Sequence, residues 1–253
     1  MPELPEVETI RRQLRTEIVS QTVLRAGSHQ SQKFLPARKT RGRRFIGLSR
    51  RGKYLIGEFD NETELIIHLG MTGQLLIDKN EKFSKNLDQY CRAWWSLANG
   101  KTVVFRDVRR FGRIAVVGKG DYSQIPTLRD MGPEPFSDGL TGNDDWLRTK
   151  GRKSRIKTQL LSQRLIAGVG NIYADEALFL ARINPALRSI SRGQGERLLE
   201  AVRTVFSEAI ERGGTTLRDY RNLEGEGRNQ HHLKCYGRSG ESCVVCGSTL
   251  RLR

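Results

Sequence analysis

Apolar residues near the start of the chain recur every three or four positions. Leu4, Val7, Ile10 and Leu14 would therefore share one face of a helix. Acidic side chains lie early in this stretch and basic side chains lie late, an order that suits the helix dipole. The pattern predicts a helix that begins almost at the first residue.

From about residue 54 onwards the pattern changes to short apolar runs that are typical of strands. Six strands are predicted: Tyr54–Phe59, Glu64–Leu69, Gln74–Asp78, Ala93–Leu97, Thr102–Arg106 and Arg113–Val117. Asn99-Gly100, between the fourth and fifth of these strands, is typical of a hairpin turn. Several short strands in succession favour a β-sandwich or a β-barrel.

Two prolines and a glycine within Met131–Pro135 indicate a linker, and the pattern beyond it is helical. Three apolar stripes have helical spacing: Ile156, Leu160, Leu161 and Leu165; Ala177, Leu178 and Ala181; Leu198, Leu199, Val202, Phe206, Ala209 and Ile210. Gly213-Gly214 would end the third helix. The polar, glycine-rich segment from Asn222 to His232 is expected to be a mobile loop. The pattern thus predicts a β-rich domain followed by a helical one, with a groove between them.

The charge balance suggests a partner. The 253 residues contain 44 Lys+Arg and 28 Asp+Glu, a formal net charge of +16 that is spread along the chain. A folded basic protein most often binds a polyanion, usually nucleic acid; a generally basic protein without such a partner is the alternative. No apolar run approaches the ~18 residues of a membrane span, and the N-terminus lacks the layout of a signal peptide. We therefore expect a cytoplasmic protein with no membrane partner.

Gly168-Val169-Gly170-Asn171 joins two predicted helices. Two glycines this close allow a sharp turn that presents N–H groups outward, and the helix that begins at Asn171 directs its positive end the same way. Such a turn is suited to bind phosphate. The alternative is a plain turn between helices.

Met71, Arg109 and Phe111 lie beside glycines at the ends of predicted strands. Side chains on such loop tips could enter a base stack, as apolar wedges do in proteins that bend DNA. From the residues alone, burial of Met71 and Phe111 in the core is the favoured alternative.

Pro2 would become the N-terminal residue if the initiator methionine were removed. An α-amine has a pKa of about 7.7–8.0, so roughly a tenth of such amines are neutral at pH 7. A neutral amine can attack an aldehyde-level carbon and form a Schiff base, and Glu3 follows directly. A structural role at the start of a helix is the alternative for both residues.

Taken together, these motifs resemble the formamidopyrimidine-DNA glycosylase family over essentially the whole chain. The segments that match the family's motifs, in chain order, are Met1–Thr9, Lys53–Leu55, His68–Gly73, Arg109–Gly112, Met131–Pro135, Gly168–Glu176, Gly213–Leu217, Tyr236–Arg238 and Cys243-x-x-Cys246. The resemblance implies an α+β fold with an N-terminal β-sandwich and flanking helices (1–133). A helix-two-turn-helix domain (134–222) and a region with the lesion loop and a partial zinc-finger hairpin (223–253) would follow.

The resemblance also implies roles for single residues. Pro2 would attack C1′ of the damaged nucleotide and Glu3 would move protons, with Lys53 beside the phosphate next to the lesion. The implied DNA-binding residues are Met71, Arg109, Phe111, Lys157, Gly168, Gly170 and Asn171. Met71, Arg109 and Phe111 would fill the space left by a flipped base. The loop after Thr216 would close over that base.

The implied activity is excision of oxidised purines from double-stranded DNA, followed by cleavage of the abasic site through a Schiff base on Pro2. Leu4, where the sister endonuclease-eight-type family has glycine, favours purines over oxidised pyrimidines. The alternatives are an enzyme for oxidised pyrimidines and a catalytically weakened relative that binds damaged DNA. We expect a monomer.

Zinc is the cofactor typical of the family, and Cys243 and Cys246 would supply two of the four ligands of a structural site. The second cysteine pair of the family's finger and the Arg at its tip are absent from these 253 residues. Three hypotheses remain: a finger that continues beyond this sequence, a degenerate finger without metal, and a makeshift site completed by His232 and Cys235. We expect weak zinc binding or none.

Overall fold

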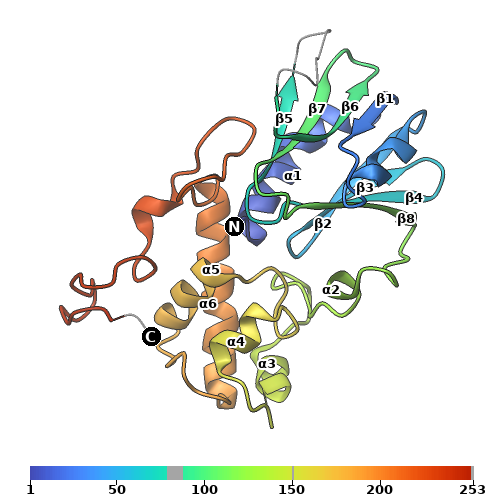
Figure 1. Ribbon diagram of the computed structural model, residues 1–253. Coiled ribbons are helices and arrows are strands. Elements are labelled where there is room, and N and C mark those ends of the chain that lie inside the picture. Colours follow the sequence, from blue (N-terminus) through green and yellow to red (C-terminus); the bar gives the residue numbers. More distant parts are fainter. Residues whose placement is uncertain (79–87, 150, 252–253) are drawn as a thin grey trace.

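The computed structural model describes residues 1–78, 88–149 and 151–251, which form a β-rich half and a helical half (Figure 1). The predicted first helix is confirmed as α1 (Leu4–Ile18). Its first turn is closed by Glu6, whose carboxylate accepts a hydrogen bond from the N–H of Glu3 at 2.8 Å. Figure 1 shows the N-terminus at the junction between the two halves.

The β-rich half contains two four-stranded antiparallel sheets. One has the order β1-β6-β7-β5 and the other β2-β3-β4-β8. The strands are β1 (Val23–Ser28), β2 (Phe45–Arg51), β3 (Tyr54–Phe59), β4 (Thr63–His68), β5 (Gly73–Asp78), β6 (Cys91–Leu97), β7 (Thr102–Asp107) and β8 (Arg113–Gly118). A short 3-10 helix, η1 (Leu35–Thr40), lies between β1 and β2.

The six predicted strands are confirmed, and β1 and β2 are additional. Leu24 and Ile46 explain why the sequence did not predict these two strands: 53% and 50% of their surfaces are exposed, so neither strand alternates cleanly between apolar and polar positions.

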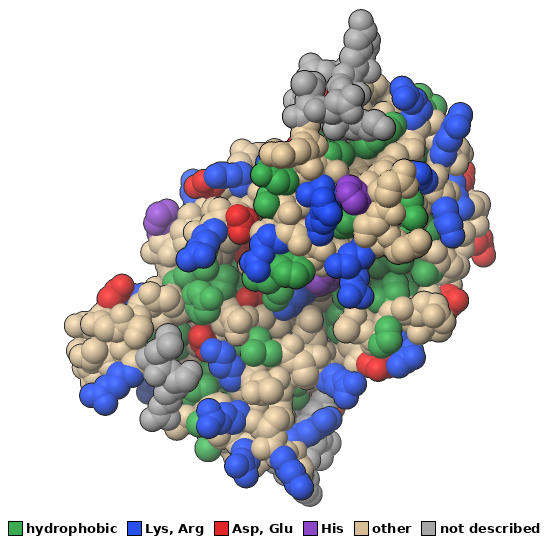
Figure 2. All heavy atoms as spheres, in the orientation of Figure 1, with side chains coloured by type: hydrophobic (Ala, Val, Ile, Leu, Met, Phe, Trp, Pro, Cys, Tyr) green, Lys and Arg blue, Asp and Glu red, His purple; other side chains and the backbone are tan. Residues whose placement is uncertain are grey.

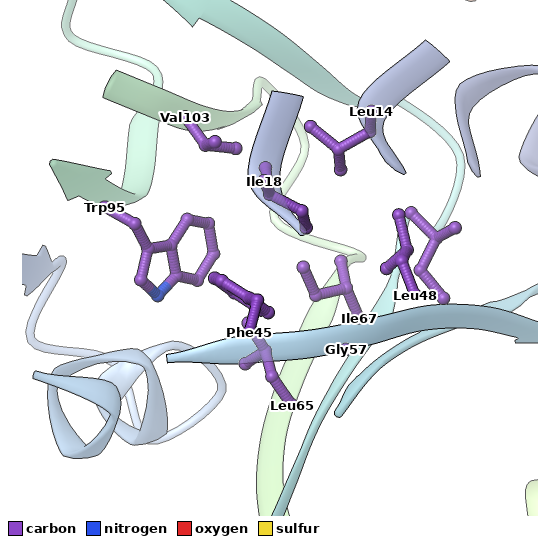
Figure 3. A pocket seen from close by; sticks show the side chains of 10 residues that line it. Leu14, Ile18, Phe45, Leu48, Gly57, Leu65, Ile67, Trp95 and Val103 are labelled. Carbon is purple, nitrogen blue, oxygen red and sulfur yellow. The ribbon is translucent and has the colours of Figure 1, made fainter. Parts of the chain in front are cut away.

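Side chains from both sheets and from α1 form one core, so the β-rich half is a sandwich. Leu14 and Ile18 of α1, Phe45 of β2 and Trp95 of β6 line a small apolar cavity in this core (Figure 3). The lining offers almost no polar group, and the indole N–H of Trp95 has no hydrogen-bond partner among the described residues. We therefore regard the cavity as packing space between the sheets.

The helical half begins after β8. Its helices are α2 (Pro126–Arg129), α3 (Gly142–Thr149), α4 (Ile156–Leu161), α5 (Asn171–Leu180), α6 (Arg192–Glu211) and the 3-10 helix η3 (Asn229–His232). Apolar side chains of α4, α5 and α6 share a second core. The apolar stripe from Ile156 to Leu165 predicted a helix that is longer than the one observed. Helix α4 ends at Leu161, and Gln163 adopts a φ of 59°, which is outside the helical region.

The segment from Asn222 to His232 differs from the loop that was predicted. It contains η3, and the buried side chain of Asn222 donates to the carbonyl of Gly213 at 3.1 Å. The side chain of Asn229 is also buried and donates to Oγ1 of Thr215 at 2.9 Å. Polar side chains therefore attach this segment to the end of α6, a contact that composition alone could not indicate.

The two halves share residues at their junction. Leu4 of α1 packs into the helical core, and its N–H donates to the carbonyl of Gly168 at 3.1 Å. Tyr220, which follows α6, packs into the core of the sandwich. The predicted domain boundaries stay a prediction. Among the residues that the structure describes, none of the helices has the length and apolar character needed to span a membrane.

Candidate active site

Glu3 lies at the N-cap of α1 with only 1% of its surface exposed. Its Oε2 accepts hydrogen bonds from the N–H groups of Gly170 at 2.7 Å and Tyr173 at 3.3 Å. Its Oε1 accepts from the N–H of Ile172 at 2.9 Å. Such N–H groups in the first turn of a helix have no partner within the helix. The carboxylate that begins α1 therefore occupies the positive end of α5.

This contact corrects the predicted phosphate site. The N–H of Gly168 donates to the side chain of Gln163 at 3.1 Å, and the N–H of Gly170 donates to Glu3. The prediction that the turn presents these N–H groups outward is therefore wrong for both glycines. Asn171, the first residue of α5, has an exposed side chain, so a DNA contact through that side chain stays a prediction.

Lys53 lies in the turn between β2 and β3, and only 4% of its surface is exposed. A Cβ on Gly170 would lie 2.4 Å from Cδ of Glu3 and 2.7 Å from Nζ of Lys53. Burial lowers the pKa of Lys53, and the nearby carboxylates of Glu3 and Glu6 oppose that shift. The absence of a side chain at Gly170 thus leaves the space that the side chains of Glu3 and Lys53 both approach. Pro2 is buried and directly precedes Glu3.

Burial raises the pKa of Glu3 to about 7, while the ammonium of Lys53 acts in the opposite direction. The carboxyl of Glu6 adds to the increase, and the hydrogen bonds from α5 reduce it. A carboxyl with this pKa is present in both protonation states near neutral pH, which suits a group that must give and take a proton.

The raised pKa of Glu3 predicts that the protein loses stability as the pH rises. Between the ordinary value of 4.5 and the folded value of about 7, the folded state holds a proton that the unfolded chain releases. This contribution to the free energy of unfolding is complete below pH 4.5 and is lost as the pH rises through 7. Its slope is at most ~1.4 kcal/mol per pH unit. Urea unfolding across this range should show the loss, and Glu3→Gln should flatten it; an identical pH dependence in the variant would contradict the assignment.

Glu6 is a second buried carboxylate and is one of the acidic side chains, early in the first predicted helix, whose position was explained by the helix dipole alone. Its Oε1 accepts from the hydroxyl of Tyr173 at 2.6 Å and from the N–H of Thr215 at 2.8 Å. Burial raises the pKa of Glu6. The carboxylate thereby joins α1 to α5 and to the segment after α6. Its position three residues after the helix cap, which is typical of a capping box, is the sequence feature that could have identified it.

His68, at the end of β4, is a further residue that the sequence analysis did not single out. Its ring packs on Tyr54 with centroids 4.6 Å apart, and its Nδ1 accepts from the N–H of Gly70 at 3.2 Å. Burial lowers the pKa of His68 to about 4, and the positive charges of Lys53 and Arg113 act in the same direction. The ring is therefore neutral at pH 7 with its proton on Nε2, a hydrogen-bond donor close to Lys53.

Met71, Arg109 and Phe111 lie on two adjoining loop tips. Met71 is 40% exposed and Phe111 45%, so the alternative that both belong to the core is wrong. The guanidinium of Arg109 lies 4.8 Å from the centroid of the Phe111 ring. Gly70 allows the loops to touch, because a Cβ there would lie 2.5 Å from the carbonyl carbon of Phe111.

The buried carboxylate of Asp107 supports both loop tips. Its Oδ2 accepts from the N–H of Gly112 at 2.7 Å, and its Oδ1 accepts from the hydroxyl of Thr72 at 2.5 Å. The same hydroxyl accepts from the N–H of Arg109 at 3.1 Å. These hydrogen bonds hold the backbone of both loops, so the exposed Met, Arg and Phe side chains extend from fixed positions.

The remaining predicted DNA contact, Lys157, lies on α4. Its ammonium forms an ion pair with Asp175 of α5 at 2.7 Å, so it lies beside the body of that helix. Figure 2 shows Lys and Arg side chains spread over one face of the molecule, across both halves. This distribution suits an extended polyanion.

Cys243 and Cys246 lie in a tight turn in which the N–H of Gly247 donates to the carbonyl of Cys243 at 2.9 Å. Within the described ranges, no group of three or more His, Cys, Asp or Glu side chains is placed to hold a metal ion. His232 and Cys235 therefore do not complete the makeshift site. Weak zinc binding or none stays a prediction, and zinc enters no step below.

The chain matches the models of two domains of one known family. Residues 1–114 match the model of the formamidopyrimidine-DNA glycosylase N-terminal domain, and residues 131–221 match the model of the formamidopyrimidine-DNA glycosylase H2TH domain. A relative named formamidopyrimidine-DNA glycosylase from Thermus thermophilus is 40% identical over 258 residues, which cover 100% of this chain and 93% of the relative. One with the same name from Deinococcus radiodurans is 38% identical over 264 residues, with coverages of 99% and 91%.

Solved structures of similar proteins include DNA complexes. The MutM (Fpg) protein of Thermus thermophilus superposes with a TM-score of 0.90 at 41% identity and covers 100% of this chain and 93% of its own. A mutant of Lactococcus lactis Fpg bound to DNA that contains Fapy-dG has a TM-score of 0.88 at 32% identity, with coverages of 99% and 93%. The Lactococcus lactis enzyme bound to DNA with an abasic site has a TM-score of 0.87 at 32% identity, with coverages of 98% and 93%.

Proposed function

Because this chain belongs to the formamidopyrimidine-DNA glycosylase family, we propose that it removes oxidised purines from duplex DNA and cleaves the abasic site that results. The observation that carries the proposal is the buried carboxylate of Glu3, which is hydrogen-bonded to the amino end of α5, lies near the ammonium of Lys53 and directly follows Pro2. Relatives solved with Fapy-dG and with abasic-site DNA support this substrate class. In this proposal the protein is a cytoplasmic repair enzyme.

Pro2 is the proposed nucleophile once Met1 has been removed. Its nitrogen lone pair attacks C1′ of the damaged nucleotide as the bond from C1′ to the base breaks, and the base leaves with a proton. Opening of the sugar ring gives an iminium between the Pro2 nitrogen and C1′. Loss of a proton from C2′ then moves an electron pair into the C2′–C3′ bond and expels the 3′ phosphate. A second elimination expels the 5′ phosphate and leaves the sugar remnant on Pro2 until water releases it.

Glu3 is the proposed acid and base for these proton transfers. With a pKa of about 7 it can protonate the leaving group and later accept a proton at the same site. Lys53 supplies a buried positive charge close to Glu3, a suitable partner for the phosphate beside the lesion. His68 offers a neutral donor close to the same lysine.

A cleavage assay tests the function directly. Duplexes carrying 8-oxoguanine, a formamidopyrimidine, an oxidised pyrimidine or an abasic site should be incubated with the protein, with and without borohydride. We expect excision of the two purine lesions and a trapped covalent adduct. Preference for the oxidised pyrimidine would support the alternative enzyme, and binding without excision or adduct would support a protein that only recognises damage.

The exposed loop tips predict a defect that depends on the substrate. Met71→Ala, Arg109→Ala and Phe111→Ala should each slow excision from a duplex by about tenfold or more, because an extruded base costs a few kcal/mol of stacking that these side chains would offset. Cleavage of an abasic site in single-stranded DNA needs no base replacement and should change little. Equal losses on both substrates would indicate misfolding and would contradict the proposal that these side chains fill the space left by the flipped base.

A further inference from the structure

Glu134 lies in the segment that joins the two halves, yet its carboxylate is directed at the turn that carries Lys53. Its Oε1 accepts from the N–H of Gly52 at 2.6 Å and from the guanidinium of Arg51 at 3.1 Å. Its Oε2 forms an ion pair with Arg50 at 2.8 Å. One carboxylate thus contacts each of the three residues that precede Lys53.

The guanidinium of Arg51 also binds the backbone of the segment that carries Glu134. It donates to the carbonyl of Met131 at 3.0 Å and to the carbonyl of Gly132 at 2.6 Å. Gly52, which has a φ of +52°, permits the approach, because a Cβ there would lie 2.4 Å from Sδ of Met131. The predicted linker is therefore packed tightly against the turn between β2 and β3.

The same segment also holds the turn before α5. The N–H of Gly132 donates to the carbonyl of Gln163 at 2.8 Å, and the N–H of Ala167 donates to the carbonyl of Pro133 at 2.8 Å. That turn leads to Gly170, which the side chains of Lys53 and Glu3 both approach. The segment from Met131 to Glu134 is thus hydrogen-bonded to both sides of the site.

We propose that Glu134 is a positioning residue for Lys53. Its carboxylate fixes the turn between β2 and β3 through the N–H of Gly52, so that the lysine ammonium stays over Gly170, near Glu3 and the amino end of α5. Arg50 and Arg51 balance the charge of the carboxylate. This inference rests on the proposed function, because its readout is excision of an oxidised purine.

A double-mutant cycle tests the proposal. Glu134→Ala should lower kcat/KM for excision by about tenfold to a hundredfold, since small displacements of a reacting group have effects of this size. In a Lys53→Ala background the same substitution should cost no more than about twofold, because the residue to be positioned is gone. Glu134→Gln keeps an oxygen for the N–H of Gly52 and should recover most of the activity of the wild type. If Glu134→Ala does not fold, Glu134→Met, which fills the space without an acceptor, takes its place in the cycle.

Glu8→Gln is the matched control, because Glu8 contacts the same Arg50 at 3.1 Å from the side of α1. It should lower the melting temperature, and its effect on excision should be the same with and without Lys53. A loss from Glu134→Ala that is equal in both backgrounds would overturn the positioning role, as would a kcat/KM within twofold of the wild type. Absence of excision by the wild-type protein would count against the proposed function itself, so the two failures are distinguishable.

Discussion

Replacing Pro2 by glycine should reduce base excision by about a hundredfold or more and should weaken the adduct trapped by borohydride. The variant keeps an α-amine but loses the secondary amine and the ring that restricts its direction of attack; a hundredfold corresponds to about 2.7 kcal/mol of the barrier. The measurement is single-turnover excision from a duplex with 8-oxoguanine, with adduct formation followed on the same substrate. Mass spectrometry of the active wild-type protein should show that Met1 has been removed.

Pro36→Gly is a suitable control for the loss of a proline ring, since Pro36 lies in η1, outside the proposed site. It should leave both excision and trapping unchanged. An active protein that retains Met1 would contradict the proposed nucleophile, because the nitrogen of Pro2 would then be an amide.

Glu3→Gln should slow excision by about a hundredfold to ten-thousandfold, the range typical of a lost general acid or base. The wild-type rate should first rise with pH, as the Pro2 amine with an α-amine pKa of about 7.7–8.0 loses its proton, and then fall, because the carboxyl of Glu3 that donates the proton is increasingly ionised above about 7. The variant has no group that titrates at this position, so this fall should be absent from its pH profile. Rates measured across the pH range on the formamidopyrimidine duplex test both statements.

Glu64→Gln provides the comparison for a buried carboxylate outside the site. Glu64 is 5% exposed and accepts from the N–H of Gly120 at 3.3 Å. Its replacement should leave the pH profile unchanged. If Glu3→Gln retained the fall at higher pH, another group would be the proton donor.

Local patterns predicted those features that depend on neighbours along the chain. The spacing of Leu4, Val7, Ile10 and Leu14 predicted α1, and Gly170-Asn171 predicted the start of α5. Asn99-Gly100 predicted the turn between β6 and β7, where Gly100 adopts a φ of +81°. Such features follow from periodicity and from the dihedral preferences of single residues. The motifs also led to Pro2, Glu3 and Lys53 as candidates, through resemblance to a family.

The contacts that make those candidates a site depend on packing between distant segments. Glu3 accepts from Gly170, 167 residues further along, and this contact reversed the predicted direction of the N–H groups before α5. Whether Met71 and Phe111 were buried or exposed was also open, since a residue at a strand end can face either way. Glu134 looked like part of a linker, and only the folded chain shows its carboxylate at Gly52. Hydrophobic patterning selects which surfaces are buried, but the partner of a buried polar group is set by whichever donor the packed halves bring to it.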